Sequence, residues 1–292
     1  MPSRIQIAFV LSLGLLGISL GSILVRFSQQ APSLTIAFYR MFWASLFLLP
    51  FYLRRRPSRP VSWRVTLGAG LALALHFACW IGSLRFTSVA VSVLLLSTSP
   101  VLVALLSYAY YRERLSRLGI AGVALTVLGS GLLVYSDLSL IEDWRGPLLA
   151  LLGGLAYAVY FVVGRGARQG MTLLEYVVPV YATAAALLAV MVMISGVPFS
   201  GFRLDTYVFL ILLALLPQCL GHTAYNWSLK YLTATMVAVL ALAEPITASA
   251  LAYWILSEPL PSMVVAGGAA VATGILLVAR WGSGTSEEID TE

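Results

Sequence analysis

The chain has 292 residues, of which 60% are hydrophobic and only 10% are charged, and its mean hydropathy is +0.92. A water-soluble domain of this size could not bury so much apolar surface, so the composition indicates an integral membrane protein. Its two cysteines, Cys79 and Cys219, lie within apolar runs and lack metal-site or disulfide-type spacing. We expect no metal and no cofactor.

Apolar runs long enough to cross a bilayer follow one another along the whole chain, separated by short polar or Pro/Gly-rich joints. They are continuous and do not alternate with polar residues, which favours helices over the strands of a membrane barrel. The predicted spans are residues 5–25, 34–53, 65–84, 88–110, 117–135, 146–164, 173–195, 206–229, 233–256 and 262–281.

The distribution of basic residues predicts the orientation, because Lys and Arg near span ends are retained in the cytoplasm. With the N-terminus inside, most basic residues fall on the inner side. The exceptions are Arg26, Arg85, Arg145 and Arg203 outside, and Arg40 within a span. We therefore expect a multi-pass protein of the plasma (inner) membrane with both termini in the cytoplasm.

The chain contains an internal repeat, in which residues 83–116 resemble residues 228–261 without a gap. The more informative matching pairs are Arg85 with Lys230, Phe86 with Tyr231, Pro100 with Pro245, Tyr108 with Tyr253, and Glu113 with Glu258. A unit of five spans crosses the membrane an odd number of times, so the second copy would be inverted. Inverted repeats are typical of secondary transporters that work by alternating access, with substrate near the midplane. We predict repeats at 1–140 and 141–284, followed by a short acidic tail at 285–292.

Several motifs together resemble those of the drug/metabolite transporter superfamily, in its ten-span EamA-type branch. They are Pro-Ser-Leu and Arg40 in span two, the mid-span prolines Pro100 and Pro245, the acids Glu113 and Glu258, and the glycine pairs Gly122/Gly129 and Gly267/Gly274. The resemblance implies an all-α membrane fold of ten helices arranged as two inverted five-helix repeats. Within the branch, the likeness is to exporters of amino acids, aromatic ones in particular, and related metabolites. The alternative substrates are drugs, sugars, purines and nucleosides.

Glu244 is the first candidate site residue, because ionisable side chains far from span ends are usually functional. It directly precedes Pro245, which is expected to bend the helix and to leave a backbone carbonyl without its amide partner. The equivalent residue of the first half is Ser99, beside Pro100. Glu244 is expected to bind substrate or a coupling cation; the alternative is a purely structural hydrogen bond.

The third and eighth spans, which are equivalent in the repeat, each carry polar and aromatic residues at helical spacing. These two faces are expected to oppose each other and bind substrate, although neighbouring helices or water would also satisfy the histidines. The residues are His76 and Trp80 in the third span, and Gln218, His222, Tyr225 and Asn226 in the eighth. We expect no metal at His76 and His222, because no other ligand stands at suitable spacing.

Tyr157 in the sixth span completes the predicted substrate site, and Tyr39 and Arg40 in the second span are candidates for coupling or gating. Two roles remain open for Arg40: a paired role in the pathway, or extension of its long side chain to the outer surface. The last span of each repeat is apolar and rich in small residues, so we expect spans five and ten at the periphery, outside two bundles that rock about the site.

A channel and an intramembrane enzyme are less consistent with this sequence than a transporter. A channel does not need a duplicated, proline-broken core, and an enzyme needs clustered acids, histidines or an activated nucleophile. The expected partners are a small-molecule substrate and the lipid bilayer, and not nucleic acid. Both a monomer and a homodimer are consistent with the sequence.

Overall fold

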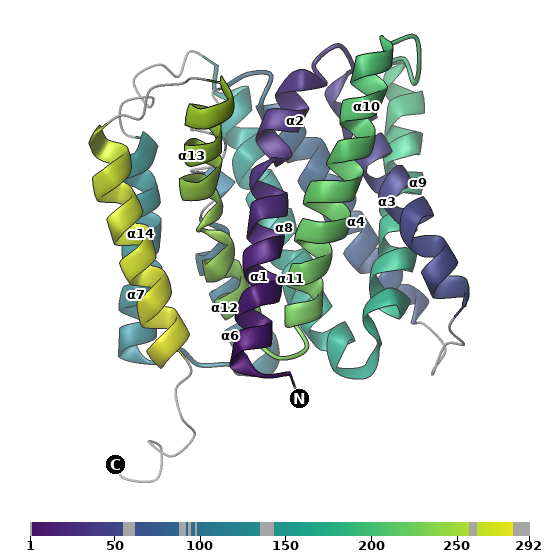
Figure 1. Ribbon diagram of the computed structural model, residues 1–292. Coiled ribbons are helices and arrows are strands. Elements are labelled where there is room, and N and C mark those ends of the chain that lie inside the picture. Colours follow the sequence, from purple (N-terminus) through teal and green to yellow (C-terminus); the bar gives the residue numbers. More distant parts are fainter. Residues whose placement is uncertain are drawn as a thin grey trace.

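The computed structural model describes residues 2–54, 62–87, 92, 95, 96, 98–134, 143–256 and 262–282. Its helices lie side by side in one bundle (Figure 1), which confirms the all-α class for these residues. In the first half they are α1 (Arg4–Ser19), α2 (Gly21–Phe27), α3 (Ser33–Leu53), α4 (Trp63–Ser83), α6 (Ser99–Tyr111) and α7 (Arg117–Val134). In the second half they are α8 (Arg145–Gly170), α9 (Leu173–Ser195), α10 (Leu204–Leu213), the π-helical segment η2 (Ala214–His222), α11 (Thr223–Ser228), α12 (Ala234–Ala241), α13 (Glu244–Leu256) and α14 (Ser262–Trp281).

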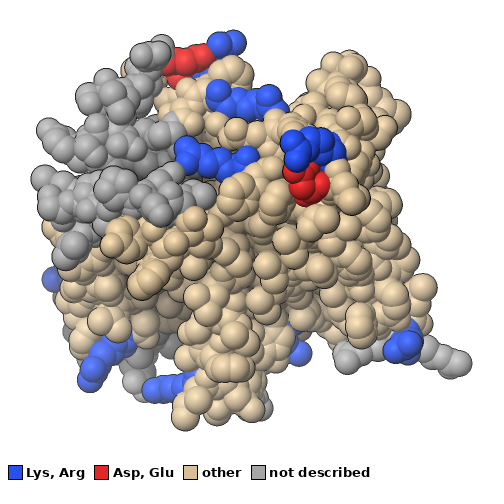
Figure 2. All heavy atoms as spheres, turned by 45° about the horizontal axis from the view of Figure 1, so that its top comes forward, with Lys and Arg blue, Asp and Glu red and all other residues tan. Residues whose placement is uncertain are grey.

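Seven helical segments of the described chain are long and apolar enough to cross a membrane, and three shorter apolar helices accompany them. The shorter ones, Ser99–Tyr111, Arg117–Leu132 and Ala266–Trp281, fall within three of the ten predicted spans. Figure 2 shows charged residues mainly toward the two ends of the visible face, with an uncharged band between them. The membrane class is thus supported, while the count of ten spans stays a prediction.

Capping residues determine where several helices begin and end. Ser3 and Gln6 form a reciprocal capping box at the start of α1, and Thr172 and Glu175 form another at the start of α9. Such boxes satisfy backbone N–H groups that have no partner inside the helix. Gly196 ends α9 with φ of 65°, a conformation that glycine adopts without steric cost.

In two predicted spans a new helix begins directly before the proline, where a bend was expected. A continuous, bent helix was predicted over 233–256, but α12 ends at Ala241, two turn residues follow, and α13 begins at Glu244. Pro245 is then the second residue of α13, where its missing N–H costs no helical hydrogen bond. In the first half, α6 likewise begins at Ser99, directly before Pro100.

The eighth predicted span differs in another way, because its middle part is a π-helix. Segment η2 contains Pro217, whose ring cannot continue an α-helical hydrogen-bond ladder. The wider π turn places residues on the helix surface differently from a regular α-helix and is often found at functional sites. Gln218 and His222 both lie in this segment and are buried.

Helices α7 and α14 pack against each other at one edge of the bundle (Figure 1), which confirms the expected peripheral position of these two helices. Glycines make the contact close. A Cβ atom on Gly122 would lie 2.8 Å from the carbonyl oxygen of Gly274, and one on Gly129 would lie 2.8 Å from the carbonyl oxygen of Gly267. Small residues are the usual means of close helix contact in membranes.

The two acids that close the matching repeats cannot be compared directly, because Glu258 lies outside the described residues. Glu113 accepts a hydrogen bond from Arg165 Nε at 3.3 Å, and Arg165 also donates to the carbonyl oxygen of Leu229 over 2.9 Å. Glu113 therefore connects the segment between α6 and α7 to α8 and, through Arg165, to the turn after α11.

Candidate functional site

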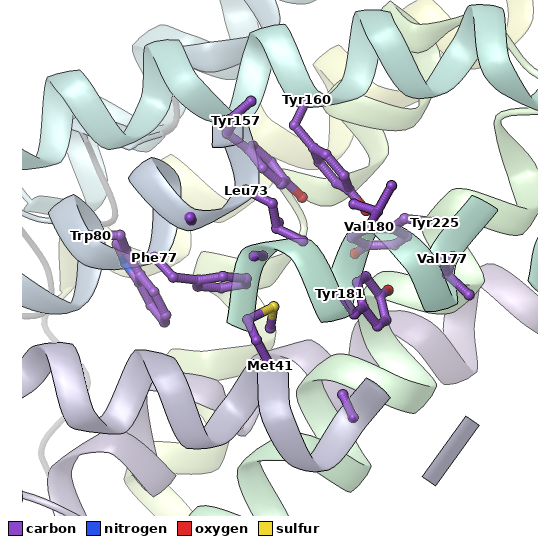
Figure 3. Packing of buried hydrophobic residues seen from close by; sticks show 14 of the residues in the cluster. Met41, Leu73, Phe77, Trp80, Tyr157, Tyr160, Val177, Val180, Tyr181 and Tyr225 are labelled. Atoms are coloured by element: carbon purple, nitrogen blue, oxygen red, sulfur yellow. The ribbon is translucent and has the colours of Figure 1, made fainter. Parts of the chain in front are cut away.

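Most of the predicted site residues meet in the buried centre of the bundle. Figure 3 shows Phe77 and Trp80 beside each other, and Tyr157 and Tyr160 extending toward Tyr225. The side chains that share this region come from α3, α4, α8, α9, η2 and α11. They are Arg40, His76, Phe77, Trp80, Tyr157, Tyr160, Tyr181, Gln218, His222, Tyr225 and Asn226.

Arg40 is only 1% exposed and does not extend to the outer surface, although α3 begins just seven residues earlier, at Ser33. Its Nε donates a hydrogen bond to Oε1 of Gln218 over 2.9 Å. The guanidinium carbon lies 4.2 Å from the ring centroid of Phe77 and 5.8 Å from that of Trp80. Within the described chain, neither Nη1 nor Nη2 has a hydrogen-bond partner. The structure therefore favours the buried role over the surface alternative.

The imidazole of His76 is held in one orientation. Nδ1 lies 3.0 Å from the carbonyl oxygen of Gly153, which can only accept, so Nδ1 carries the proton. The ring stacks on Tyr157 with centroids 4.6 Å apart, and the rings of Trp80 and His222 each lie 6.2 Å away. The third and eighth predicted spans therefore meet at His76 and His222, while substrate binding by these two faces stays a prediction. The described residues contain no group of three or more side chains suited to a metal.

Asn226 is fully buried and organises a hydroxyl network next to this ring cluster. Its Nδ2 donates to Tyr160 Oη over 2.6 Å and to Tyr181 Oη over 3.3 Å, and also to the carbonyl of its own helix at His222. The Oδ1 atom has no donor within the described chain. Asn226 therefore serves at least a structural role between α8, α9 and α11.

Glu244 and Ser99 occupy equivalent places, each as the first residue of a helix that begins inside an apolar stretch. The Glu244 carboxylate interacts electrostatically with Arg40 and with the hydroxyl groups of Tyr157 and Tyr225. No Glu244–Arg40 ion pair within 4 Å is found between these two described residues. Ser99 is buried, whereas Glu244 is partly accessible.

Helix α1 contacts the first turn of α13 directly, through a hydrogen bond between the hydroxyl groups of Ser19 and Thr247. Thr247 also donates to the carbonyl oxygen of Ala243 over 3.1 Å. The start of α13 is therefore tied to the first helix of the chain.

Tyr39 is the predicted residue that the structure does not bring into the cluster. Its ring packs edge-on against Tyr207 with centroids 6.2 Å apart, and it also contacts Phe38. It precedes Arg40 in the chain by one position but points elsewhere, since successive helical residues differ in direction by about 100°. Tyr39 therefore packs at the edge of the core, with its ring against Tyr207.

Phe77 and Tyr181 belong to the cluster but were not predicted. Phe77 stands in an apolar run of α4 beside His76, and Tyr181 lies in the mostly apolar α9, so neither has a sequence signal of its own. A Cβ at Gly21 would lie 3.8 Å from Arg40 Nη1 and 3.7 Å from Trp80, so this glycine leaves space beside the guanidinium.

Comparison with known proteins identifies the family of this chain. The family model of the EamA-like transporters matches residues 4–135 and 144–280. A protein of Archaeoglobus fulgidus named "Uncharacterized transporter" is 29% identical over 282 residues, covering 94% of this chain and 96% of the relative. "Uncharacterized transporter YxxF" of Bacillus subtilis is 24% identical over 225 residues, covering 74% of this chain and 71% of the relative.

A solved crystal structure resembles this fold with a TM-score of 0.80 at 17% sequence identity, covering 94% of this chain and 97% of the other. At that identity the likeness concerns the fold alone. The comparisons support a transporter and give no specific likeness to the aromatic amino acid exporter.

Proposed function

Since this chain belongs to the EamA-like transporter family, we propose that it exports amino acids, aromatic ones among them, or related small metabolites across the inner membrane by alternating access. It is then a secondary transporter and not an enzyme. The proposal of amino acids as substrates is based on the buried Arg40 guanidinium, whose two Nη groups have no acceptor within the described chain.

A carboxylate is the ligand that suits these two groups. A buried charge is costly unless it is paired, and a guanidinium can bind a carboxylate through two parallel hydrogen bonds. Gln218 occupies only Nε, so Nη1 and Nη2 are available to the substrate. Trp80 Nε1 and Gln218 Nε2 are further buried donors without an acceptor in the described chain.

The surroundings of Arg40 fit the rest of an amino acid. Glu244, which interacts electrostatically with Arg40, supplies a negative charge for an ammonium group. The rings of Phe77, Trp80 and Tyr157 provide apolar faces for an aromatic side chain. We infer that the carboxylate binds to Arg40 and that the ammonium group, or a coupling proton, binds to Glu244.

The α7–α14 contact supports two inverted repeats. Gly122 corresponds to Gly267 in the sequence repeat, and Gly129 corresponds to Gly274. Gly122 faces Gly274, and Gly129 faces Gly267. Exchanging the repeats converts one of these contacts into the other, as a two-fold axis requires. The two separate matches of the family model agree with this division.

A second pair of contacts has the same relationship. A Cβ on Gly14 of α1 would lie 3.4 Å from the carbonyl oxygen of Gly221, and a Cβ on Gly153 of α8 would lie 3.4 Å from that of His76. His76 and Gly221 correspond in the repeat, and Gly14 and Gly153 lie in the first and sixth predicted spans, the first span of each proposed unit. We therefore propose ten spans as two five-helix units, residues 1–140 and 141–284.

The proposed orientation places both chain termini in the cytoplasm. The start of α1 and the end of α14 lie at the same end of the bundle (Figure 1), and the excess of basic residues favours this end as the inner one. Export then requires the site at Arg40 to open first toward this end.

Transport by the purified protein in liposomes tests the proposal. The panel consists of amino acids, their amides, sugars, purines and cationic drugs. We expect saturable flux of amino acids. The corresponding amides, which lack the carboxylate, should neither be transported nor inhibit this flux. Arg40→Lys keeps the charge but loses the two-pronged geometry, so its kcat/KM should fall about 10- to 100-fold. Arg203→Lys, at an exposed arginine, is the control.

Three results would contradict the proposal. They are equal transport of amino acids and their amides, a flux that never saturates, and chemical conversion of a labelled substrate. Saturable transport of a sugar, purine or drug without amino acid transport would assign the protein to the alternative substrate classes.

A further inference from the structure

A cavity of about 640 Å³ opens between the end of α3, the turn from α8 to α9, and the end of α11. These segments lie away from the central cluster, at the end of the bundle that carries the N-terminus (Figure 1). Three basic residues line the cavity, namely Arg54, Arg168 and Lys230. The transport mechanism proposed above uses none of them.

One of the three positive charges of this cavity, that of Arg168, is held in place by hydrogen bonds to the backbone. Arg168 is 2% exposed, and its Nε donates to the carbonyl oxygen of Asn226 over 3.0 Å, while Nη1 donates to the carbonyl oxygen of Met171. Glu175 interacts electrostatically with Arg168 and offsets part of its charge. Arg54 and Lys230 are exposed at the rim, so the cavity retains a net positive charge.

Apart from Thr172, the other residues that line the cavity are apolar or aromatic. Phe51, which is 56% exposed, and Leu48 come from the last turns of α3, and Trp227 comes from α11. Beside Phe51, Leu53 is 71% exposed. A positively charged cavity that continues into an exposed apolar surface at the end of a membrane bundle suits a ligand with an anionic head and an apolar tail.

We propose that this cavity binds the headgroup of an anionic phospholipid, with the phosphate among Arg54, Arg168 and Lys230 and the acyl chains along Phe51 and Leu48. In the orientation proposed above, this lipid belongs to the cytoplasmic leaflet, where anionic lipids attract basic segments. Lipid binding itself requires neither that orientation nor any transport activity.

A bound lipid would also stabilise the central site indirectly. Arg168 holds the backbone of Asn226, and the Asn226 side chain holds Tyr160 and Tyr181. A phosphate that fixes Arg168 therefore restrains the end of α11 against α8 and α9.

Native mass spectrometry and thermal unfolding of the purified full-length protein in detergent test this inference. The probes are phosphatidylglycerol, phosphatidylcholine and inorganic phosphate. We expect phosphatidylglycerol to bind and to raise the Tm, and the other two to do neither. Arg54→Gln with Lys230→Gln should weaken phosphatidylglycerol binding about 30-fold, from two lost basic contacts. Arg4→Gln, an exposed arginine of α1, should leave it unchanged.

The inference is overturned if both phospholipids bind equally, or if the double variant retains the preference for phosphatidylglycerol. It is also overturned if inorganic phosphate raises the Tm as much as the lipid, because the cavity then binds a soluble anion. Loss of amino acid transport in the test of the proposed function would leave all these readouts unaffected.

Discussion

Arg40 on α3 and Gln218 in η2 are joined by a hydrogen bond of 2.9 Å from Nε to Oε1. This bond connects the two proposed repeats at the buried guanidinium. Gln218 is a neutral acceptor, so it orients Arg40 without neutralising its charge. The arrangement leaves the positive charge available to a carboxylate ligand.

Gln218→Glu tests this relationship. The new carboxylate should pair with Arg40 and compete with the carboxylate of the substrate, because the two groups have the same chemistry. We expect transport to fall at least about tenfold while the Tm stays the same or rises. Uptake in liposomes and thermal unfolding are the two measurements. Gln29→Glu, at an exposed position, is the control, and full transport by Gln218→Glu would contradict the assignment of Arg40.

Glu244→Gln tests whether the acid at the start of α13 couples transport to protons. A glutamine keeps the shape but cannot take up or release a proton. We expect uptake driven by a pH gradient to be lost and substrate exchange without a gradient to continue. Asp205→Asn, at an exposed acid paired with Arg203, serves as the control. Unchanged pH dependence in Glu244→Gln would show that another group, or no group, couples protons.

Gly129→Ala tests the close packing of α7 on α14. The added methyl group would meet Ala270 Cβ and the backbone at Gly267 and Val271, all at 2.8 Å. Overpacking of this kind costs about 1–3 kcal/mol, so the Tm should fall. Gly131→Ala is a matched control in the same helix, because a Cβ there meets nothing within 4 Å. Equal Tm values for the two variants would contradict the packing account.

A reversible crosslink between α1 and α13 tests alternating access. Ser19 and Thr247 are in hydrogen-bond contact, so cysteines at these positions should form a disulfide on oxidation. The background needs Cys79→Ala and Cys219→Ala, since both native cysteines are free thiols. We expect oxidation to stop transport and reduction to restore it, whereas Ser19→Cys alone stays active. Undiminished transport by the oxidised double variant would mean that α1 and α13 do not separate.

The sequence was sufficient to predict the helical membrane class and the polar, aromatic faces that carry His76 and His222. Both depend on composition and on helical spacing, which local chemistry determines. It was less informative about Glu244, where a bend was expected and a complete break between α12 and α13 was found. A proline indicates that a helix is perturbed, but the surrounding packing decides how far.

The contacts of Arg40 were not predictable in the same way. Its position near the start of α3 allowed both a surface and a buried conformation of the side chain. The buried conformation depends on Gln218, which is distant in sequence. Gln218 lies in a π-helix, which no periodicity of the sequence indicates. The contacts of Tyr39 were not predictable either. It neighbours Arg40 in the chain, yet its side chain packs against Tyr207.

The π-helical segment η2 has a consequence for the energetics of the transport cycle. Its counterpart in the first repeat, the matching part of α4, is a regular α-helix. If the two proposed repeats exchange conformations during transport, identical repeats would make the inward- and outward-facing states equivalent by a two-fold rotation, and therefore equal in free energy. The extra width of η2 would then remove this equality, so that one state is preferred even without substrate and part of the binding free energy is used to reach the other.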